Sequence, residues 1–340
     1  LAYRWVAHDI EAINFTAKEL ELASSVTQAF DIAARSGIPS QNMMVGDNAG
    51  NVGWTIMGPL PNKFGQAGET PVFWHQGNNG WEGYLTPEQY PKILNPDNNR
   101  LWTANSRVVG GEMLKSIGNG GYALGARAGQ IRDDLFNLKT FDEKALLAIG
   151  LDERALFLKR WQKFLLSTVL NEQSLISHPH FEEVQSILAQ DTSLSANVDS
   201  VSYRLVRNFR INVRDLAFSE LNDTFTTLDG GYKFHSIRYQ IETPLWQLVN
   251  QQPDNFLMRP LSSWQAVFNQ ALQQTIDDMI TLDSGEKQAL AKATWGQQNM
   301  ASIKHPLSKS VPFIGKWLDM PANALSGDSY MPKVQGKDFG

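Results

Sequence analysis

The chain has 340 residues, of which 42% are hydrophobic and 19% are charged, a composition typical of a folded protein with one large core or two domains. Its formal net charge of −5 argues against a basic surface for nucleic acid or anionic lipid. The absence of cysteine excludes disulfides, thiolate metal sites and a cysteine nucleophile within this chain. No apolar run reaches the ~18 residues that a transmembrane helix needs, so we expect no membrane-spanning segment.

Both ends of the sequence lie inside apparent structural elements. The chain opens with LAYRWVAHD, whose apolar and aromatic residues alternate as in a β-strand, and it closes with VQGKDFG. There is no initiator methionine and no signal peptide. We therefore interpret the sequence as an internal piece of a longer polypeptide.

The first ~110 residues predict strands and one helix. Thr16 and Glu19 have the spacing of a capping box, and apolar residues then recur at helical spacing as far as Ala33. Next, NMMVGDNAGNVGWTIM carries two apolar runs around the turn-forming sequence DNAGN, which is typical of a β-hairpin. RLWTANSRVVGG then reads as a strand that runs into a glycine-rich turn and carries Asn105.

From about residue 111 the pattern becomes helical. DERALFLKRWQKFLL places Ala155, Leu158, Trp161 and Leu165 on one face of a helix. Further helical patterns cover residues 179–190, 197–221, 261–283 and 285–295.

The predicted fold class is therefore α+β. We expect part of a sheet domain over residues 1–112 and a helical domain over 113–296. An extended segment over 297–340 should return towards the sheet domain.

Several stretches suggest chemistry only weakly. GDNAGNVGW and GNGGYALGARAG lack the spacing of a phosphate-binding loop. HPHFEEV, residues 178–184, offers metal-ligating side chains, but Pro179 places it at a helix start, where acidic residues favour the helix dipole. Trp74, Trp81 and Trp102 could line a sugar or acyl site, or could pack against the sheet.

Asn105 raises a sharper question. A buried amide without hydrogen-bond partners costs a few kcal/mol, so this side chain is either satisfied within the protein or kept for a ligand. The residues around it do not decide between the two.

Several segments, taken in order, resemble the penicillin acylase family of N-terminal-nucleophile (Ntn) hydrolases. DNAGNVGWTIMGPLPNK resembles the family's hairpin D-x-x-G-N-I-G-Y…G-x-x-P-x-R, and NPDNNRLWTANSRV resembles its segment ending in an Ala-Asn strand. LGARAGQIRDDL resembles its G-x-R-x-x-x-I helix. The resemblance extends from YRWVAHD to GDSYMPKVQGKDFG and rests on the order and spacing of the segments, because no single motif is strong.

The resemblance implies part of an αββα Ntn sandwich and an amidase mechanism. In this family a precursor cleaves itself, and the new β chain begins with a Ser that is the nucleophile, while its own α-amino group is the base. Asn105 matches the asparagine of the oxyanion hole, and Arg127 matches the arginine that supports the active site. Substrates would be N-acyl amides, such as a β-lactam side chain or an acyl-homoserine lactone.

The same resemblance locates what this chain lacks. Its first residue is Leu1, so the nucleophile would lie upstream, and the chain alone would be inactive. Its partners would be the α chain and the N-terminal part of the β chain of the same precursor, in the periplasm or secreted. We expect no cofactor here; calcium is common in the family, but the carboxylate that helps hold it falls near Ser116, which leaves calcium open for the complete enzyme only.

Two other functions remain compatible with the sequence. One is a periplasmic module that binds a carbohydrate or other small ligand through the Trp-rich loop 73–84. In that case Trp74→Ala and Trp81→Ala would abolish binding, and Asn105→Ala would have little effect. The other is a non-catalytic relative of the family.

Overall fold

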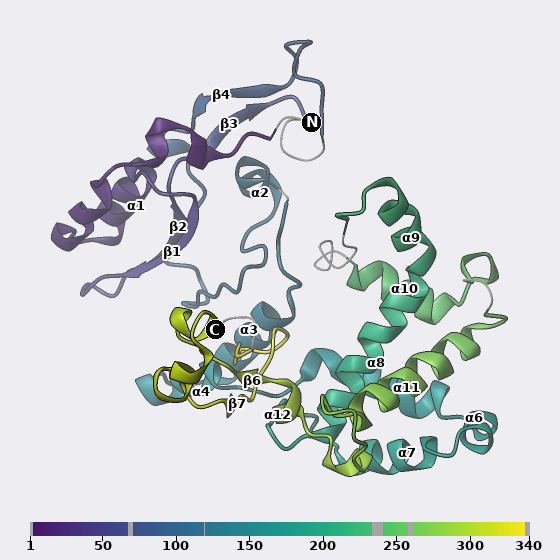
Figure 1. Cartoon of the computed structure of the whole chain (residues 1–340). Helices are drawn as coiled ribbons and strands as arrows, with labels where there is room; N and C mark the ends of the chain where they lie inside the picture. The colour runs from purple at the N-terminus through teal and green to yellow at the C-terminus, as the bar shows by residue number, and fades with distance from the viewer. Residues whose placement is uncertain (1–2, 67–70, 119, 233–240, 258–260, 337–340) are drawn as a thin grey trace. The chain divides into compact units, whose positions relative to one another are not determined.

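The computed structural model describes residues 3–66, 71–118, 120–232, 241–257 and 261–336. The chain forms two compact units, residues 1–128 and 129–340 (Figure 1). The described part is mostly helical with small sheets, which confirms the predicted α+β class at this level. The three-part division at residues 112 and 296 stays a prediction.

The first unit contains the longer strands. Its elements, in chain order, are η1 (Val6–His8), η2 (Ile10–Ala12), η3 (Thr16–Leu22), α1 (Val26–Arg35), β1 (Gln41–Gly46), β2 (Val52–Met57), β3 (Pro61–Phe64), β4 (Gly80–Tyr84), η4 (Pro87–Gln89), β5 (Lys92–Leu94), α2 (Gly111–Ile117) and the start of α3 (Ala126–Asn137). Strands β1, β2 and β5 form an antiparallel sheet in that order, and β3 pairs with β4.

The hairpin predicted around residues 47–51 is confirmed as β1 and β2. Asp47 directly follows β1, and its carboxylate accepts hydrogen bonds from Asn51 Nδ2 and from the backbone N–H groups of Ala49, Asn51 and Val26. These bonds, above all the one from the Asn51 side chain, lower the pKa of Asp47. The turn residue therefore also holds the start of α1.

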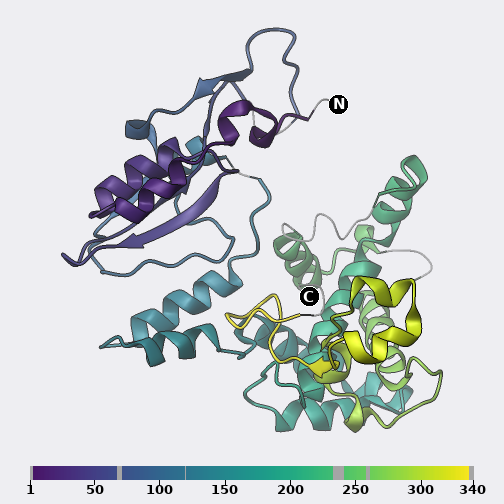
Figure 2. The same ribbon diagram turned by 60° about the vertical axis from the view of Figure 1, so that its left-hand side comes forward.

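Helix α1 covers one face of this sheet, as Figure 2 shows. The absence of a side chain at Gly53 lets the Phe30 ring approach so closely that a Cβ there would lie 2.3 Å from Phe30 Cζ. Trp54 and Ile56 alternate with Gly53 along β2 and so point to the opposite face, where they form a small core with Leu60 and Tyr90. One face of the sheet is thus closed by α1, and the other carries the aromatic core.

Three predictions in this unit are wrong. The predicted opening strand is absent, and the segment forms the short 3-10 helices η1 and η2. No described strand pairs with this segment, so its backbone N–H groups bond locally, as His8 N does to Trp5 O. The helix begins at Val26 and not at Thr16, because Ser25 Oγ is the acceptor that caps it, from Gln28 N at 3.2 Å. Residues 100–109 form no strand but a bent segment around Asn105.

The second unit is built from helices. Its elements, in chain order, are α4 (Glu143–Gly150), η5 (Leu156–Leu158), α5 (Lys159–Phe164), the π-helical η6 (Leu165–Val169), α6 (Glu172–Ser177), α7 (Phe181–Gln190), α8 (Val201–Ala217), α9 (Ser219–Leu228), α10 (Glu242–Gln251), η8 (Asp254–Phe256), α11 (Trp264–Ile280), η9 (Leu290–Lys292), α12 (Trp295–Gln298), β6 (Met300–Ala301), η10 (Pro306–Lys309), η11 (Pro312–Ile314), α13 (Gly315–Leu318) and β7 (Asn323–Ala324).

Its core confirms the helical face read from the sequence, since Ala155, Leu158, Trp161 and Leu165 are all fully buried. Helices α8 and α11 pack against each other at its centre. The predicted helix over 285–295 is wrong, because only the short η9 forms there, after a turn closed by the bridge between Thr281 and Lys287.

Buried ion pairs hold the C-terminal segment on α8. Asp328 accepts a hydrogen bond from Tyr203 Oη at 2.7 Å and is paired with Arg207 Nε. Next to it, Arg210 pairs with the buried Glu242 and donates to Tyr330 Oη at 3.0 Å. Arg207 and Arg210 therefore each have a partner of opposite charge, as burial of a charge requires.

Candidate functional site

Asn105 lies at a tight bend between two buried neighbours, Ala104 and Ser106, while its own side chain is exposed. Its φ of 59° is in the left-handed region, which asparagine tolerates better than most residues with a Cβ. The Asn105 carbonyl accepts a hydrogen bond from Ala123 N at 2.8 Å. The bend therefore turns the amide side chain outwards from a fixed backbone.

Arg127 sets the orientation of that amide. It lies in the first turn of α3, and its Nη2 donates to Asn105 Oδ1 at 2.9 Å. A guanidinium can only donate hydrogen bonds, so the oxygen of the amide must face Arg127 and the NH₂ must face away. Within the described part of the chain, no acceptor takes a hydrogen bond from Asn105 Nδ2. The pair therefore presents an oriented donor.

A cavity of about 560 Å³ lies next to this bend, because Ser106 is one of its walls. Its apolar lining includes Trp54 and Ile56 from β2 and Val108 from the segment after Asn105. The Trp54 indole donates to Asn42 Oδ1 at 3.0 Å, which fixes the ring. The volume falls within the range of small-molecule sites.

Charged groups also line the cavity. Arg4 lies with its guanidinium carbon 4.6 Å above the Trp81 ring and is paired with Asp9 at 2.9 Å. Lys63 donates from Nζ to Ile117 O at 2.9 Å. The described lining residues include these two cations and no carboxylate.

The structure separates the three tryptophans that the sequence singled out. Trp81 lines the cavity, whereas Trp74 and Trp102 are not among the described lining residues. Trp74 is 41% exposed and lies 6.2 Å from Trp81 between ring centroids, tilted by 56°. Two indoles at this angle do not form the flat platform on which a sugar ring would stack.

Sequence reasoning missed two further lining tryptophans, Trp5 and Trp54. The signal for Trp54 was available, since it alternates with Ile56 in a hairpin strand and both must therefore point to one face. Trp5 carried no such signal, because its position depends on the turn of η1.

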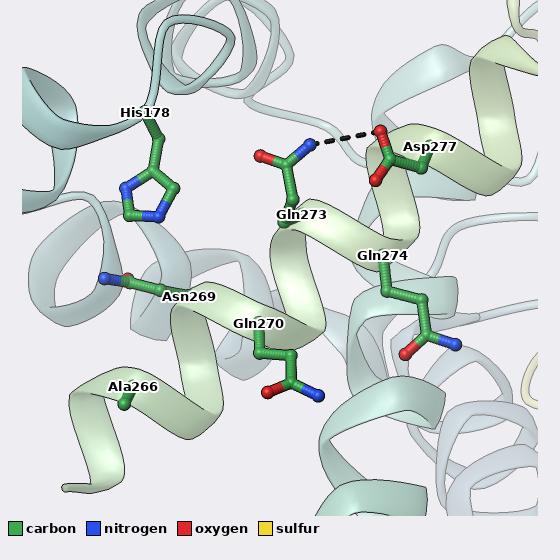
Figure 3. A pocket seen from close by; sticks show the side chains of 7 residues that line it. All are labelled: His178, Ala266, Asn269, Gln270, Gln273, Gln274 and Asp277. Atoms are coloured by element: carbon green, nitrogen blue, oxygen red, sulfur yellow. Dashed lines mark hydrogen bonds between the residues drawn. The ribbon is translucent and has the colours of Figure 1, made fainter. Parts of the chain in front are cut away.

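A second cavity, also of about 560 Å³, lies in the helical unit along α11 (Figure 3). The amides of Asn269, Gln270, Gln273 and Gln274 line it from consecutive turns, and His178 lies on the side of Asn269 and Gln273. His178 shares a hydrogen bond between Nδ1 and Ser174 O and stacks on Phe181, so its ring is held by the protein itself. This ordered imidazole accounts for part of the HPHFEEV sequence without a ligand.

Two features are absent among the residues described. In the described part of the chain, no group of three or more His, Asp or Glu side chains could hold a metal ion. Likewise, no helix in the described ranges has the length and apolar character to cross a membrane.

The chain is similar in sequence to several curated acylases. The most similar curated relatives include penicillin acylase 2 proenzyme of Pseudomonas sp. strain SE83, 32% identical over 87 residues, which are 26% of this chain and 11% of that protein. Acyl-homoserine lactone acylase QuiP of Pseudomonas aeruginosa is 26% identical over 162 residues, covering 48% of this chain and 19% of the relative. QuiP of Pseudomonas fluorescens Pf-5 is 26% identical over 197 residues, which are 55% of this chain and 24% of that protein.

A solved structure shares the fold. Thermostable penicillin G acylase from Alcaligenes faecalis superposes with a TM-score of 0.55 over 82% of this chain and 53% of that one, at 15% sequence identity. The chain thus matches about half of this structure and at most a quarter of the curated relatives above. The family model described as penicillin amidase matches residues 1–340. Because this match covers the whole sequence, the chain belongs to the penicillin amidase family.

Proposed function

We propose that this chain supplies the oxyanion donor and part of the acyl-binding cavity of an enzyme that hydrolyses N-acyl amides. The carrying observation is the Asn105 amide, whose oxygen is held by Arg127 and whose NH₂ is left facing outwards. Its position beside a cavity with an apolar, Trp-lined wall fits a substrate that has an amide carbonyl and a hydrophobic acyl group. The names of the relatives suggest a β-lactam side chain or an acyl-homoserine lactone as the substrate.

The nucleophile in this proposal is an N-terminal Ser that precedes residue 1. An α-amino group with a pKa near 8 can accept the proton of the Ser hydroxyl as the oxygen attacks the amide carbonyl. The carbonyl oxygen then becomes an oxyanion, to which Asn105 Nδ2 donates a hydrogen bond. Collapse of this intermediate expels the amine, which takes up the proton, and water later hydrolyses the acyl ester.

Asn105 gains its effect from being fixed before the reaction. A preorganised donor of this kind contributes about 3–4 kcal/mol to stabilising the transition state, or roughly 10²–10³ in kcat. Arg127 is a positioning residue in this scheme, because it acts on the reacting oxygen only through the Asn105 amide. The cavity walls formed by Trp54, Trp81 and Val108 would hold the acyl group.

The rest of the enzyme is also part of the proposal. The sheet of β1, β2 and β5 would belong to an αββα sandwich completed by strands from the α chain and from the N-terminal part of the β chain. The precursor would process itself, and the mature protein would be periplasmic or secreted. Trp74 and Trp102 would then contribute to the surroundings of the substrate and not to the cavity itself.

The test uses the complete protein from its native source, with its N-termini and masses determined. A chain that begins with Ser upstream of residue 1, together with a separate α chain, is the expected result. Steady-state kinetics with hexanoyl and phenylacetyl p-nitroanilides would then compare the wild type with Asn105→Gly. Glycine keeps the left-handed backbone and removes only the amide, so we expect kcat to fall about 10²–10³-fold.

Asn99 provides the matched control. It is also an exposed asparagine with a positive φ, 53°, in the loop that leads to the site. Asn99→Gly should leave kcat unchanged. If Asn105→Gly is as active as Asn99→Gly, Asn105 is not the oxyanion donor. If the protein instead binds a ligand that Trp81→Ala abolishes and Asn105→Gly leaves intact, the binding-module function replaces the amidase.

A further inference from the structure

Lys63 connects the β3–β4 hairpin to the end of α2. Its Nζ donates to Ile117 O at 2.9 Å, and Ile117 is the last residue of that helix. The final carbonyls of a helix have no donor within the helix, and a cation there also meets the negative end of the helix dipole. Lys63 therefore acts as a side-chain cap that fixes where α2 ends.

The residue after the helix is adapted to this contact. Gly118 has a φ of 106°, and a Cβ at this position would lie 2.9 Å from Lys63 Nζ. The Gly118 carbonyl in turn accepts a hydrogen bond from Tyr122 Oη at 3.1 Å. The side chain of Tyr122 therefore bonds back to the residue that directly follows α2.

The same segment then reaches Asn105. Ala123, the neighbour of Tyr122, donates its N–H to the Asn105 carbonyl at 2.8 Å. Three hydrogen bonds, joined by the peptide links Ile117–Gly118 and Tyr122–Ala123, thus connect Lys63 to the backbone of Asn105. Arg127 holds the side chain of the same residue separately.

We propose that Lys63 is a positioning residue for Asn105. By fixing the end of α2, it places the segment whose Ala123 N–H sets the Asn105 bend, and so the direction of the amide. This inference rests on the proposed function of Asn105 as an oxyanion donor. A displacement of about 1 Å at a reacting group can cost up to ~10²-fold in rate, so a residue outside the chemistry can have a large effect.

The first test compares Lys63→Met and Lys63→Arg in the complete enzyme. Methionine keeps much of the aliphatic stem and loses the donor, and we expect kcat to fall about 10- to 100-fold with little change in KM. Arginine should restore most of the rate, since it can still donate to Ile117 O. Lys92 is the matched control, because it is an exposed lysine of β5 whose Nζ also donates to a carbonyl, that of Pro87; Lys92→Met should leave kcat unchanged.

Lys63 also lines the cavity, so direct contact with the substrate is the competing explanation. In that case Lys63→Met would change KM by factors that differ between the hexanoyl and phenylacetyl substrates. A positioning role lowers kcat by the same factor for both. Acyl-dependent changes in KM, or an unchanged kcat, overturn the inference.

A double variant separates the inference from the proposed function. If Lys63 acts through Asn105, then Lys63→Met has little further effect, within about 2-fold, once Asn105→Gly is present. Independent losses that multiply overturn the positioning role while leaving Asn105 as the donor. Full activity of Asn105→Gly alone overturns the proposed function itself.

A structural readout does not depend on turnover. Hydrogen exchange at the Ala123 amide should be faster in Lys63→Met than in the wild type or Lys92→Met, because its bond to the Asn105 carbonyl is loosened. Tyr122→Phe removes the bond to Gly118 O and should also speed hydrogen exchange at the Ala123 amide. This variant replaces Lys63→Met in the test if Lys63→Met does not fold. Unchanged exchange in the variants that fold overturns the inference.

Discussion

Arg127 Nη2 and Asn105 Oδ1 lie 2.9 Å apart and join two residues separated by 22 positions in the sequence. Replacing Arg127 by Met leaves the Asn105 amide free to rotate, so its donor is no longer preoriented. Hydrogen bonds to charged groups are worth about 1.5–3 kcal/mol, which corresponds to a loss of roughly 10- to 100-fold in kcat. Steady-state kinetics on the complete enzyme would measure it.

Arg132→Met is the control for this change. Arg132 is an exposed residue of the same helix that pairs with its neighbour Asp133. Its replacement should leave kcat at the wild-type value. Equal activity of the Arg127 and Arg132 variants would show that the Asn105 amide needs no such support.

The contact between Gly53 and Phe30 predicts a loss of stability. A Cβ at position 53 would lie 2.3 Å from Phe30 Cζ and 2.8 Å from Val26 Cγ1, so Gly53→Ala must push α1 away from β2. Overpacking of this kind costs about 1–3 kcal/mol. Gly46→Ala on β1, where the nearest atom would lie 3.5 Å away, should be close to neutral in the same chemical denaturation experiment.

Asp328 should be among the most sensitive positions of the helical unit. Asp328 is buried and pairs with the partly buried Arg207, so Asp328→Asn removes the charge that compensates this arginine; breaking a buried ion pair typically costs about 3–5 kcal/mol. Asp215→Asn tests the opposite case, since Asp215 is itself exposed to solvent where it pairs with Arg214 on the same helix. That change should cost no more than about 1 kcal/mol. Similar midpoints of urea unfolding for the two variants would contradict the conclusion that the Asp328 ion pair matters more to stability than the Asp215 ion pair.

The same residue predicts a dependence of stability on pH. Burial alone would raise the pKa of Asp328, but the charge of Arg207 and hydrogen bonds from Arg207, Ser329 N and Tyr203 together lower it below the usual value of 3.8. Because the pKa is lower in the folded state, the carboxylate stabilises the fold at pH above about 4, and this contribution is lost as the pH falls through the folded-state pKa. The difference in unfolding free energy between wild type and Asp328→Asn should therefore be constant from pH 7 to pH 5 and shrink below pH 4. A difference that grew on acidification would have the wrong sign.

Local patterns in the sequence predicted local structure well. The period of 3.6 residues found the buried face of Ala155, Leu158, Trp161 and Leu165, and turn-forming residues found the hairpin at Asp47. The capping box at Thr16 predicted the helix start wrongly. Thr16 opens only the 3-10 helix η3, whereas α1 begins after Ser25, whose side chain caps it.

The site was less accessible to prediction because its contacts join distant segments. The resemblance to the family pointed to Asn105 and Arg127, but it did not reveal that the bend is left-handed. Lys63 and Ile117 are 54 residues apart, and nothing in either segment predicts their contact. The strand predicted at Asn105 was wrong because the backbone bends there, with a left-handed φ of 59° at Asn105 that an extended strand does not contain.

The left-handed backbone at position 105 also restricts the variation that the protein can accept there. Glycine, asparagine and aspartate enter this conformation at modest cost, whereas β-branched and bulky residues do not. Of these three, asparagine alone carries an uncharged NH₂ donor. A library randomised at this codon and selected only for folding should retain all three residues, while one selected for turnover should retain asparagine.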